Sequence, residues 1–278
     1  ALGINAGIGN LGVSVIFLLA PVVIAMDIFV PIFGGPQTLS DGGKIFLQNA
    51  CYVGIVQIIA VLFFIAKYMD NLPIPKQSPK ALLSMFTNKH TWIMTWIYTC
   101  GFGSFIGYSV ALSLLVAKEF PEVSFAYAAF LGPFIGAGIR PFGGWLSDKI
   151  NNGSLITLLS LIGIFVAAIA VLFGIEQHNF PLFFGAFLVL FLMTGFETGA
   201  SFRMIPYIFA DTVQSSLVTG FTAAIGAYGA FFVPKIFGWS YASTGSVSAA
   251  FYILIAFTAA TIVITYWFYA RKNSGIRC

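Results

Sequence analysis

Arg140 is the residue whose type and position are most suited to binding a ligand. It interrupts an otherwise apolar and glycine-rich run from Phe130 to Gly144, and the next charged residue, Asp148, lies about 12 Å further along a helix. An arginine at membrane depth costs at least about 2.5 kcal/mol, so it should face a cavity or a partner. Its guanidinium keeps its charge and presents a planar fork of donors that suits a small planar oxyanion. Snorkelling to the surface or a structural ion pair are the alternatives.

A second buried charge is expected at Glu197, in the apolar stretch that ends near Arg203. A carboxyl group inside a membrane span is costly and is commonly functional. It could therefore bind a coupling proton, or it could serve as the structural counter-ion of a basic group on another helix. The sequence favours the structural role without deciding the question.

Aromatic residues accompany Arg140. Tyr98 and Phe102 are four residues apart and so share one face of a helix. Two such rings could clamp a flat solute. Since 17% of the chain is aromatic, ordinary packing or contact with lipid is the alternative.

Two glycine-rich windows form an internal repeat, residues 3–12 and 220–229. Five of the ten positions are identical: Gly3 with Gly220, Ala6 with Ala223, Ile8 with Ile225, Gly9 with Gly226, and Gly12 with Gly229. Glycine lets a backbone approach a neighbour or a substrate closely. Gly3 and Gly7 share a helix face, which we expect Gly12 to continue, and Asn10 adds a polar group there. Plain helix–helix packing would also explain these glycines.

The composition requires a bilayer around these residues. Hydrophobic residues make up 59% of the 278 positions and charged residues only 8%, far fewer than cover a soluble protein. A spanning helix needs roughly 20 mostly apolar residues. We expect eight such spans, at 3–30, 47–67, 91–116, 124–147, 154–175, 181–208, 216–238 and 247–270. The fold class is therefore an all-α, polytopic membrane bundle.

The repeat and the charges predict the domain organisation. If the two windows are equivalent in two six-helix repeats, residues 1–68 are the last two helices of a first bundle, 69–90 are a cytoplasmic linker, and 91–278 are a complete second bundle. We thus expect eight of twelve spans here. With the C-terminus inside the cell, nine Lys and Arg residues lie in inner connectors and three in outer ones, as the positive-inside rule requires.

Other function classes find no support in the sequence. The net charge of +4 gives no reason to expect nucleic-acid binding, and Cys51, Cys100 and Cys278 have no metal-site spacing. No nucleophile–base pair, zinc motif or phosphate-binding glycine loop is present. We therefore expect neither an enzyme nor a bound metal or cofactor.

A known family resembles this pattern. The segment Gly144-Trp145-Leu146-Ser147-Asp148-Lys149 resembles the conformational loop that follows the second and eighth helices of the major facilitator superfamily. The windows 3–14 and 220–232 resemble the two signature helices of its nitrate/nitrite porter family. The resemblance covers nearly the whole chain.

The resemblance implies roles for individual residues. Arg140 would bind the substrate, with Tyr98 and Phe102 lining the same site. Asn10, Gly220, Thr222 and Gly226 would belong to the signature helices beside the substrate, and Gly3, Gly7, Gly9, Gly12 and Gly229 would pack them; Gly144, Asp148 and Lys149 would form the conformational loop. The sequence departs from the family pattern at two positions. The family has a serine near the position of Ala223, and its site contains few acidic residues, so Glu197 is not expected there.

The function implied is secondary transport of nitrate, nitrite or both, by antiport or proton-coupled symport. We expect a monomer in the plasma (inner) membrane, with lipid, the anion and, in the symport case, protons as its partners. A carrier of another small anion is the near alternative, and a membrane receptor or assembly subunit is the distant one. A second substrate arginine would lie in helices that precede residue 1.

Overall fold

The computed structural model describes residues 2–27, 34–39, 42–70, 83–124, 128–272, 274, 276 and 278. The described part is helical apart from a small antiparallel hairpin, Gln37–Thr38 (β1) with Lys44–Ile45 (β2), in the connector between the first two helices. The helices are α1 (Leu2–Ala25), α2 (Leu47–Tyr68), the 3-10 turn η1 (Met85–Thr87), α4 (Lys89–Tyr98), the π-helix η2 (Thr99–Gly103), α5 (Ser104–Glu119), α6 (Leu131–Ile150), α7 (Gly153–Glu176), α8 (Phe180–Ile208), α9 (Thr212–Ala227), α10 (Gly229–Thr244), α11 (Ser248–Thr265) and the π-helix η3 (Tyr266–Ala270).

Within the described residues, seven helical stretches are long and apolar enough to cross a membrane, which confirms the all-α polytopic prediction. The remaining predicted span, 124–147, corresponds to α6, which does not meet that criterion because glycines and charged residues lower its hydropathy. It begins at Leu131 and not at 124, and it runs to Ile150. Gly144 to Lys149 are therefore the last turns of this helix and not a loop, which corrects the prediction.

Other boundaries also differ from the prediction. The first helix ends at Ala25, and residues 28–30 of the predicted span lie outside the described part. Most of the predicted linker, 71–82, also lies outside it, and α4 already begins at Lys89. The predicted span 216–238 is longer, covering 212–244, and is divided at Tyr228 into α9 and α10.

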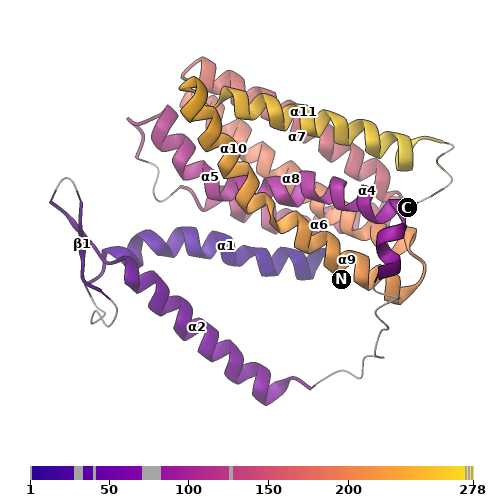
Figure 1. The fold of residues 1–278 in the computed structure, drawn as a ribbon, viewed down its shortest axis with the longest axis horizontal. Coiled ribbons are helices and arrows are strands. Elements are labelled where there is room, and N and C mark those ends of the chain that lie inside the picture. The colour runs from indigo at the N-terminus through magenta and orange to yellow at the C-terminus, as the bar shows by residue number, and fades with distance from the viewer. Residues whose placement is uncertain are drawn as a thin grey trace.

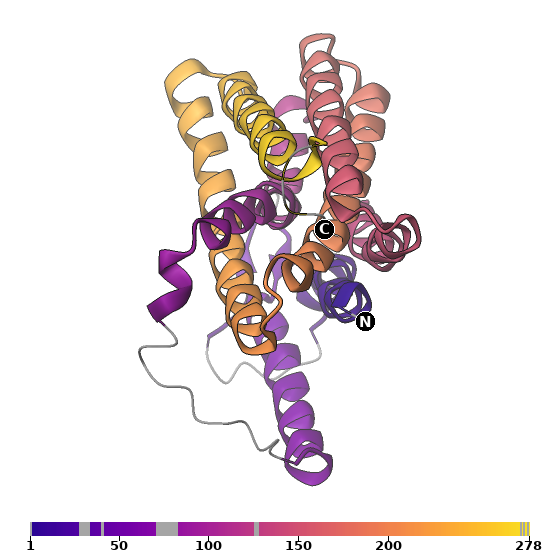
Figure 2. The ribbon, with the colours of Figure 1, turned by 90° about the vertical axis from the view of Figure 1, so that its right-hand side faces the viewer.

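Helices α4 to α11 pack together, and α1 lies along one side of them, against α6 and α8 (Figure 1). The contact between α1 and α6 is antiparallel: Gly3 lies beside Pro141, and the Ser14 hydroxyl donates to the Phe130 carbonyl oxygen at 3.1 Å. By contrast, α2 diverges from α1 and extends away from the other helices (Figures 1 and 2). Its apolar side chains are exposed from Ile55 to Ile65.

The core of the packed helices is rich in phenylalanine. Three rings in a row on α8 are fully buried: Phe183, Phe187 and Phe191. They contact Tyr108 and Phe105 on α5. Each ring removes a large apolar area from its surroundings and packs edge-to-face or tilted on the next. This core holds α5 and α8 in place beside α6, the helix that carries Arg140.

Candidate anion-binding site

Arg140 is fully buried in α6 and is only partly satisfied by the protein. Its Nη1 donates a hydrogen bond to the Ala6 carbonyl oxygen of α1 at 3.3 Å. Its Nε and Nη2 are also buried, yet neither has a hydrogen-bond partner, and within the described ranges no carboxylate forms an ion pair with it. Nε and Nη2 form one edge of the guanidinium plane. Two parallel donors on one edge match the two oxygens of a planar anion.

Aromatic rings cover the guanidinium. Its central carbon lies 4.2 Å from the centre of the Phe105 ring and 5.1 Å from that of Phe102, distances at which the cation is attracted to the ring face. The sequence predicted Phe102 but did not single out Phe105. The signal was present, because Tyr98, Phe102 and Phe105 follow one another at helical spacings of four and three residues.

Tyr98 lies one ring further from the arginine. It is 2% exposed, stacks on Phe202 of α8 with ring centres 4.3 Å apart, and meets Phe102 at 5.1 Å. The phenol therefore belongs to the aromatic cluster that covers the arginine, although among the described contacts neither a hydrogen bond nor a cation–π contact joins it to the guanidinium. Phe202 was not predicted for this site.

The signature glycines of α1 and α9 divide into two kinds. A Cβ on Gly3 would meet the Arg140 carbonyl oxygen at 3.2 Å, and one on Gly7 would meet the Ala137 carbonyl oxygen at 3.0 Å, so these two hold α1 close to α6. Gly9 and Gly12 meet no neighbour in the described structure, so Gly12 does not continue that face as we expected. On α9, Gly220 is likewise open towards the described residues.

Gly226 and Gly229 pack against the interrupted span 89–119. A Cβ on Gly226 would lie 2.9 Å from Cδ1 of Tyr98 and 3.2 Å from Cδ1 of Phe102, and Gly229 contacts the backbone of Gly103. A π-helix inside a longer helix often marks a functional site, and here it places Phe102 between α9 and Arg140.

The two polar signature residues have local partners. Asn10 donates through Nδ2 to the Ala6 carbonyl oxygen at 2.8 Å, the same oxygen that Arg140 contacts. Thr222 is fully buried, and its hydroxyl shares a hydrogen bond of 3.0 Å with that of Thr95. The structure thus brings Asn10 next to Arg140, whereas Thr222 pairs with Thr95 on α4 and makes no hydrogen bond with the guanidinium in the described structure.

Glu197 lies behind the aromatic cluster on α8. It is fully buried, and among the described residues neither carboxylate oxygen makes a hydrogen bond of ordinary geometry, although the Ser201 hydroxyl on the same helix lies near enough to interact with it. Its carboxyl group occupies the space that a side chain at Gly101 of η2 would need. No direct basic partner is found for it among the described residues.

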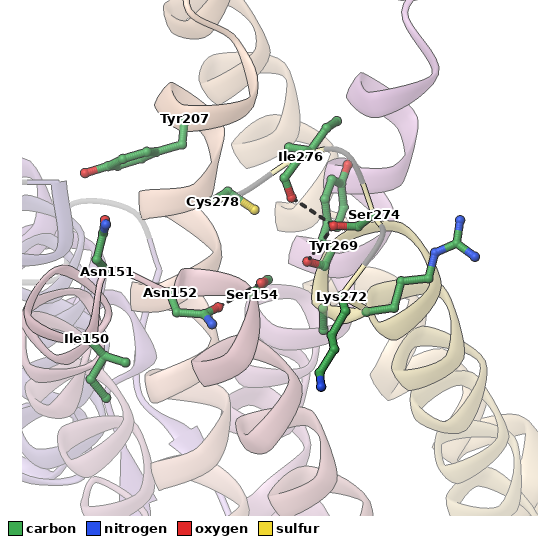
Figure 3. Close-up of a pocket in the computed structure, with 12 residues that line it drawn as sticks. Ile150, Asn151, Asn152, Ser154, Tyr207, Tyr269, Lys272, Ser274, Ile276 and Cys278 are labelled. Carbon is green, nitrogen blue, oxygen red and sulfur yellow. Dashed lines mark hydrogen bonds between the residues drawn. The ribbon is translucent and has the colours of Figure 1, made fainter.

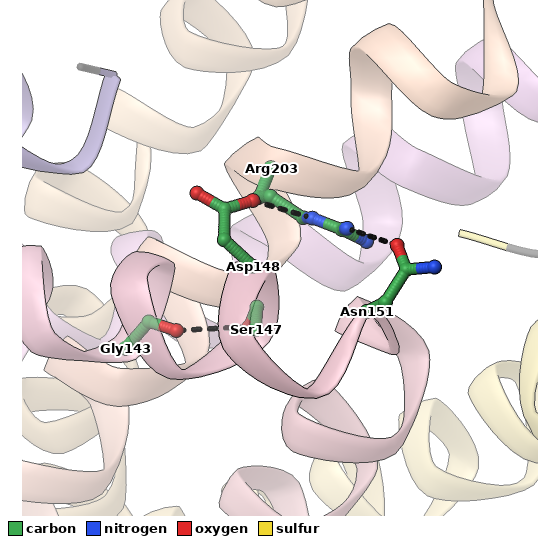
Figure 4. Close-up of polar contacts among 5 residues, drawn as sticks. All are labelled: Gly143, Ser147, Asp148, Asn151 and Arg203. Carbon is green, nitrogen blue, oxygen red and sulfur yellow. Dashed lines mark hydrogen bonds and ion pairs between the residues drawn. The ribbon is translucent and has the colours of Figure 1, made fainter.

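The end of α6 forms a separate polar cluster (Figure 4). Asp148 accepts a hydrogen bond from Nε of Arg203 at 2.9 Å, and Arg203 also donates through Nη2 to Asn151 at 3.0 Å. Asn151 ends the helix in a left-handed conformation, with φ of 54°. Lys149 points instead over the Trp145 ring. This ion pair joins the ends of α6 and α8.

Gly144 and Asp148 also line a cavity of about 350 Å³ beside Gly3 and Arg203. A larger cavity, about 620 Å³, lies between the start of α7 and the end of the chain (Figure 3). It is lined by Arg271 and Lys272 but includes none of the residues around Arg140. Here burial raises the pKa of the Cys278 thiol to about 12.

Comparisons with known proteins agree with this architecture. No protein-family model matches the chain. A nitrate/nitrite transporter NarU of Salmonella typhimurium is 38% identical over 98% of this chain and 64% of its own length. A probable nitrate/nitrite antiporter NarK2 of Thermus thermophilus is 34% identical over all of this chain and 65% of its own length. Over nearly its whole length, the chain is therefore similar to nitrate/nitrite transporters. It spans just under two thirds of the length of these relatives.

The fold is also that of a solved transporter of the major facilitator superfamily. The crystal structure of FucP, a transporter of that superfamily in the outward conformation, superposes with a TM-score of 0.51 at 16% identity, covering 78% of this chain and 53% of FucP. The chain is therefore a multi-pass membrane protein with the major facilitator fold. Its curated relatives are transporters and not enzymes.

Proposed function

We propose that this chain forms the larger part of a secondary transporter that moves nitrate, nitrite or both across a membrane by alternating access. The observation that carries the proposal is the free edge of Arg140: two buried donors that have no partner among the described residues, beneath two aromatic rings. A planar monovalent anion would satisfy both donors and neutralise the charge. Its flat face would fit beside the rings, which also exclude water and so strengthen the electrostatic attraction.

Transport itself requires no bond to be made or broken. We propose that residues 1–68 and 91–278 belong to two bundles that rock about the anion, with the linker 69–90 between them. The contacts at Gly3 and Gly7 support such movement, because close backbone packing without interlocking side chains lets α1 and α6 slide. Arg140 is held by a carbonyl of α1, so a change at this contact alters the site directly.

We further propose a monomer in the plasma (inner) membrane, surrounded by lipid, with its C-terminus in the cytoplasm. The excess of Lys and Arg in the inner connectors supports this orientation. The remaining partner is the proton, which would be required for symport but not for nitrate/nitrite exchange.

The decisive experiment is uptake of ¹⁵N-nitrate by vesicles that contain the full-length protein, with and without internal nitrite. Uptake that internal nitrite accelerates supports an exchanger. Competition by other small anions tests whether nitrate is the preferred substrate. Saturable nitrate binding without any uptake would contradict transport and favour a receptor.

A further inference from the structure

The buried carboxyl of Glu197 has no function in a simple anion exchanger. It is fully buried on α8, and among the described residues only the Ser201 hydroxyl, one turn along the same helix, lies near enough to interact with its oxygens as a hydrogen-bond donor. The space that it occupies exists only because residue 101 is a glycine. A carboxyl group that served as a structural counter-ion would instead contact a basic group. Within the described residues none lies in ion-pair contact with it.

The groups that interact with Glu197 electrostatically come from three neighbouring elements. They are Arg140 on α6, Tyr98 on α4 and Cys100 on η2. Arg140 is the only one of these three that is positively charged. An ionised carboxylate in this apolar position would be very costly unless the arginine balanced it. The carboxylate of Glu197 and an external anion therefore compete for the same positive charge.

We propose that Glu197 is a proton-binding site coupled to the anion site at Arg140, so that one proton enters with each anion. This inference rests on the proposed transport function. Without substrate, the ionised carboxylate balances Arg140; with nitrate bound, the anion balances Arg140 and Glu197 takes up a proton. Both states carry no net charge at the site. Both can therefore reorient across the membrane, which is what symport requires.

Linkage makes the coupling reciprocal. If binding of the anion raises the proton affinity of Glu197, then protonation of Glu197 must raise the affinity for the anion by the same factor. Nitrate affinity should fall up to about tenfold for each unit of pH above the titration of Glu197. A neutral amide at this position mimics the protonated acid. Glu197→Gln should therefore bind nitrate at all pH values as the wild type binds it at low pH.

The test uses the full-length protein in two measurements. Nitrate affinity is measured against pH, and vesicles are assayed both for nitrate/nitrite exchange and for nitrate accumulation driven by a pH gradient. Glu197→Gln should keep exchange, lose gradient-driven accumulation and lose the pH dependence of affinity. Glu176→Gln is the matched control, since that acid is exposed at the end of α7 and should behave as wild type.

Each outcome decides the proposal. An unchanged pH dependence in Glu197→Gln, or the loss of both transport modes together, would overturn it. If the variant does not fold, proton uptake by the wild type on adding nitrate in weak buffer decides: about one proton per anion supports the proposal, and none overturns it. A wild type that neither binds nor moves nitrate at any pH would instead refute the proposed function.

Discussion

Replacing Arg140 by lysine keeps the positive charge but removes the geometry of the site. The arginine has one donor bound to Ala6 and two free donors on a single edge. Lysine would present a point charge at the end of a flexible chain, without the rigid fork. We expect the variant to insert into the membrane, because the charge is unchanged, but to lose nearly all transport.

The magnitude follows from the interactions that lysine cannot make. One charge-assisted hydrogen bond contributes about 1.5–3 kcal/mol, which corresponds to a roughly 10- to 150-fold loss of nitrate affinity. The guanidinium also lies over Phe102 and Phe105, and weaker attraction to these rings removes on the order of 0.5–2 kcal/mol more. The combined loss should bring uptake near background at nitrate concentrations that half-saturate the wild type.

The assay compares nitrate binding and vesicle uptake for Arg140→Lys and for Arg271→Lys. The control residue also lies over an aromatic ring, Trp267 at 4.4 Å, but outside the anion site. Arg271→Lys should transport at the wild-type rate. If Arg140→Lys binds and moves nitrate as well as the wild type, the two free donors are not the anion site and the proposal is wrong.

Three other substitutions test the surrounding structure. Gly226→Leu should block transport more than insertion, since even a Cβ there lies 2.9 Å from the Tyr98 ring; Gly238→Leu, on a position without close neighbours among the described residues, should retain uptake in the same vesicle assay. Gly7→Leu should reduce uptake by separating α1 from α6, because its Cβ would already lie 3.0 Å from a carbonyl oxygen of α6, and cysteine cross-linking between the two helices should weaken in parallel. Asp148→Asn should lower the free energy of unfolding by roughly 1 kcal/mol, because Arg203 is buried while Asp148 is largely exposed and screened by solvent. The loss should be measurable as a lower melting temperature in detergent. An unchanged melting temperature would show that this pair does not stabilise the protein.

The sequence predicted the fold class because membrane helices are specified by composition and length. It placed five of the eight spans within three residues at each end, and it missed mainly what depends on packing. The division of one span at Tyr228 and the π-helix at Thr99–Gly103 arise where two helices meet at Gly103 and Gly229. The spacing of apolar residues within either helix does not indicate that contact. The late start of α6 at Leu131 was missed because the preceding residues are equally apolar.

Part of the candidate site could also be predicted from the sequence. A charged residue in an apolar span is conspicuous, so Arg140 and Glu197 could be named from the sequence alone. The groups around them could not be predicted, because each comes from another helix. Ala6 contributes a backbone oxygen to Arg140, and Gly101 leaves room for the side chain of Glu197. The counter-ion role that the sequence favoured for Glu197 required a basic neighbour, and the described structure places none in ion-pair contact with it.

In the proposed transporter, the arrangement of Arg140 would connect anion binding with helix movement. Its side chain is fixed by a carbonyl of α1 on one side and by rings of η2 and α5 on the other, while its own backbone packs against Gly3 and Gly199. Separating α1 from α6 would therefore remove a partner of the guanidinium at the moment when the site opens. An unpaired buried arginine is costly, so an anion that bridges the free edge would stabilise the closed arrangement more than the open one. The charge that we propose as the anion's binding site would thus also favour closure around it.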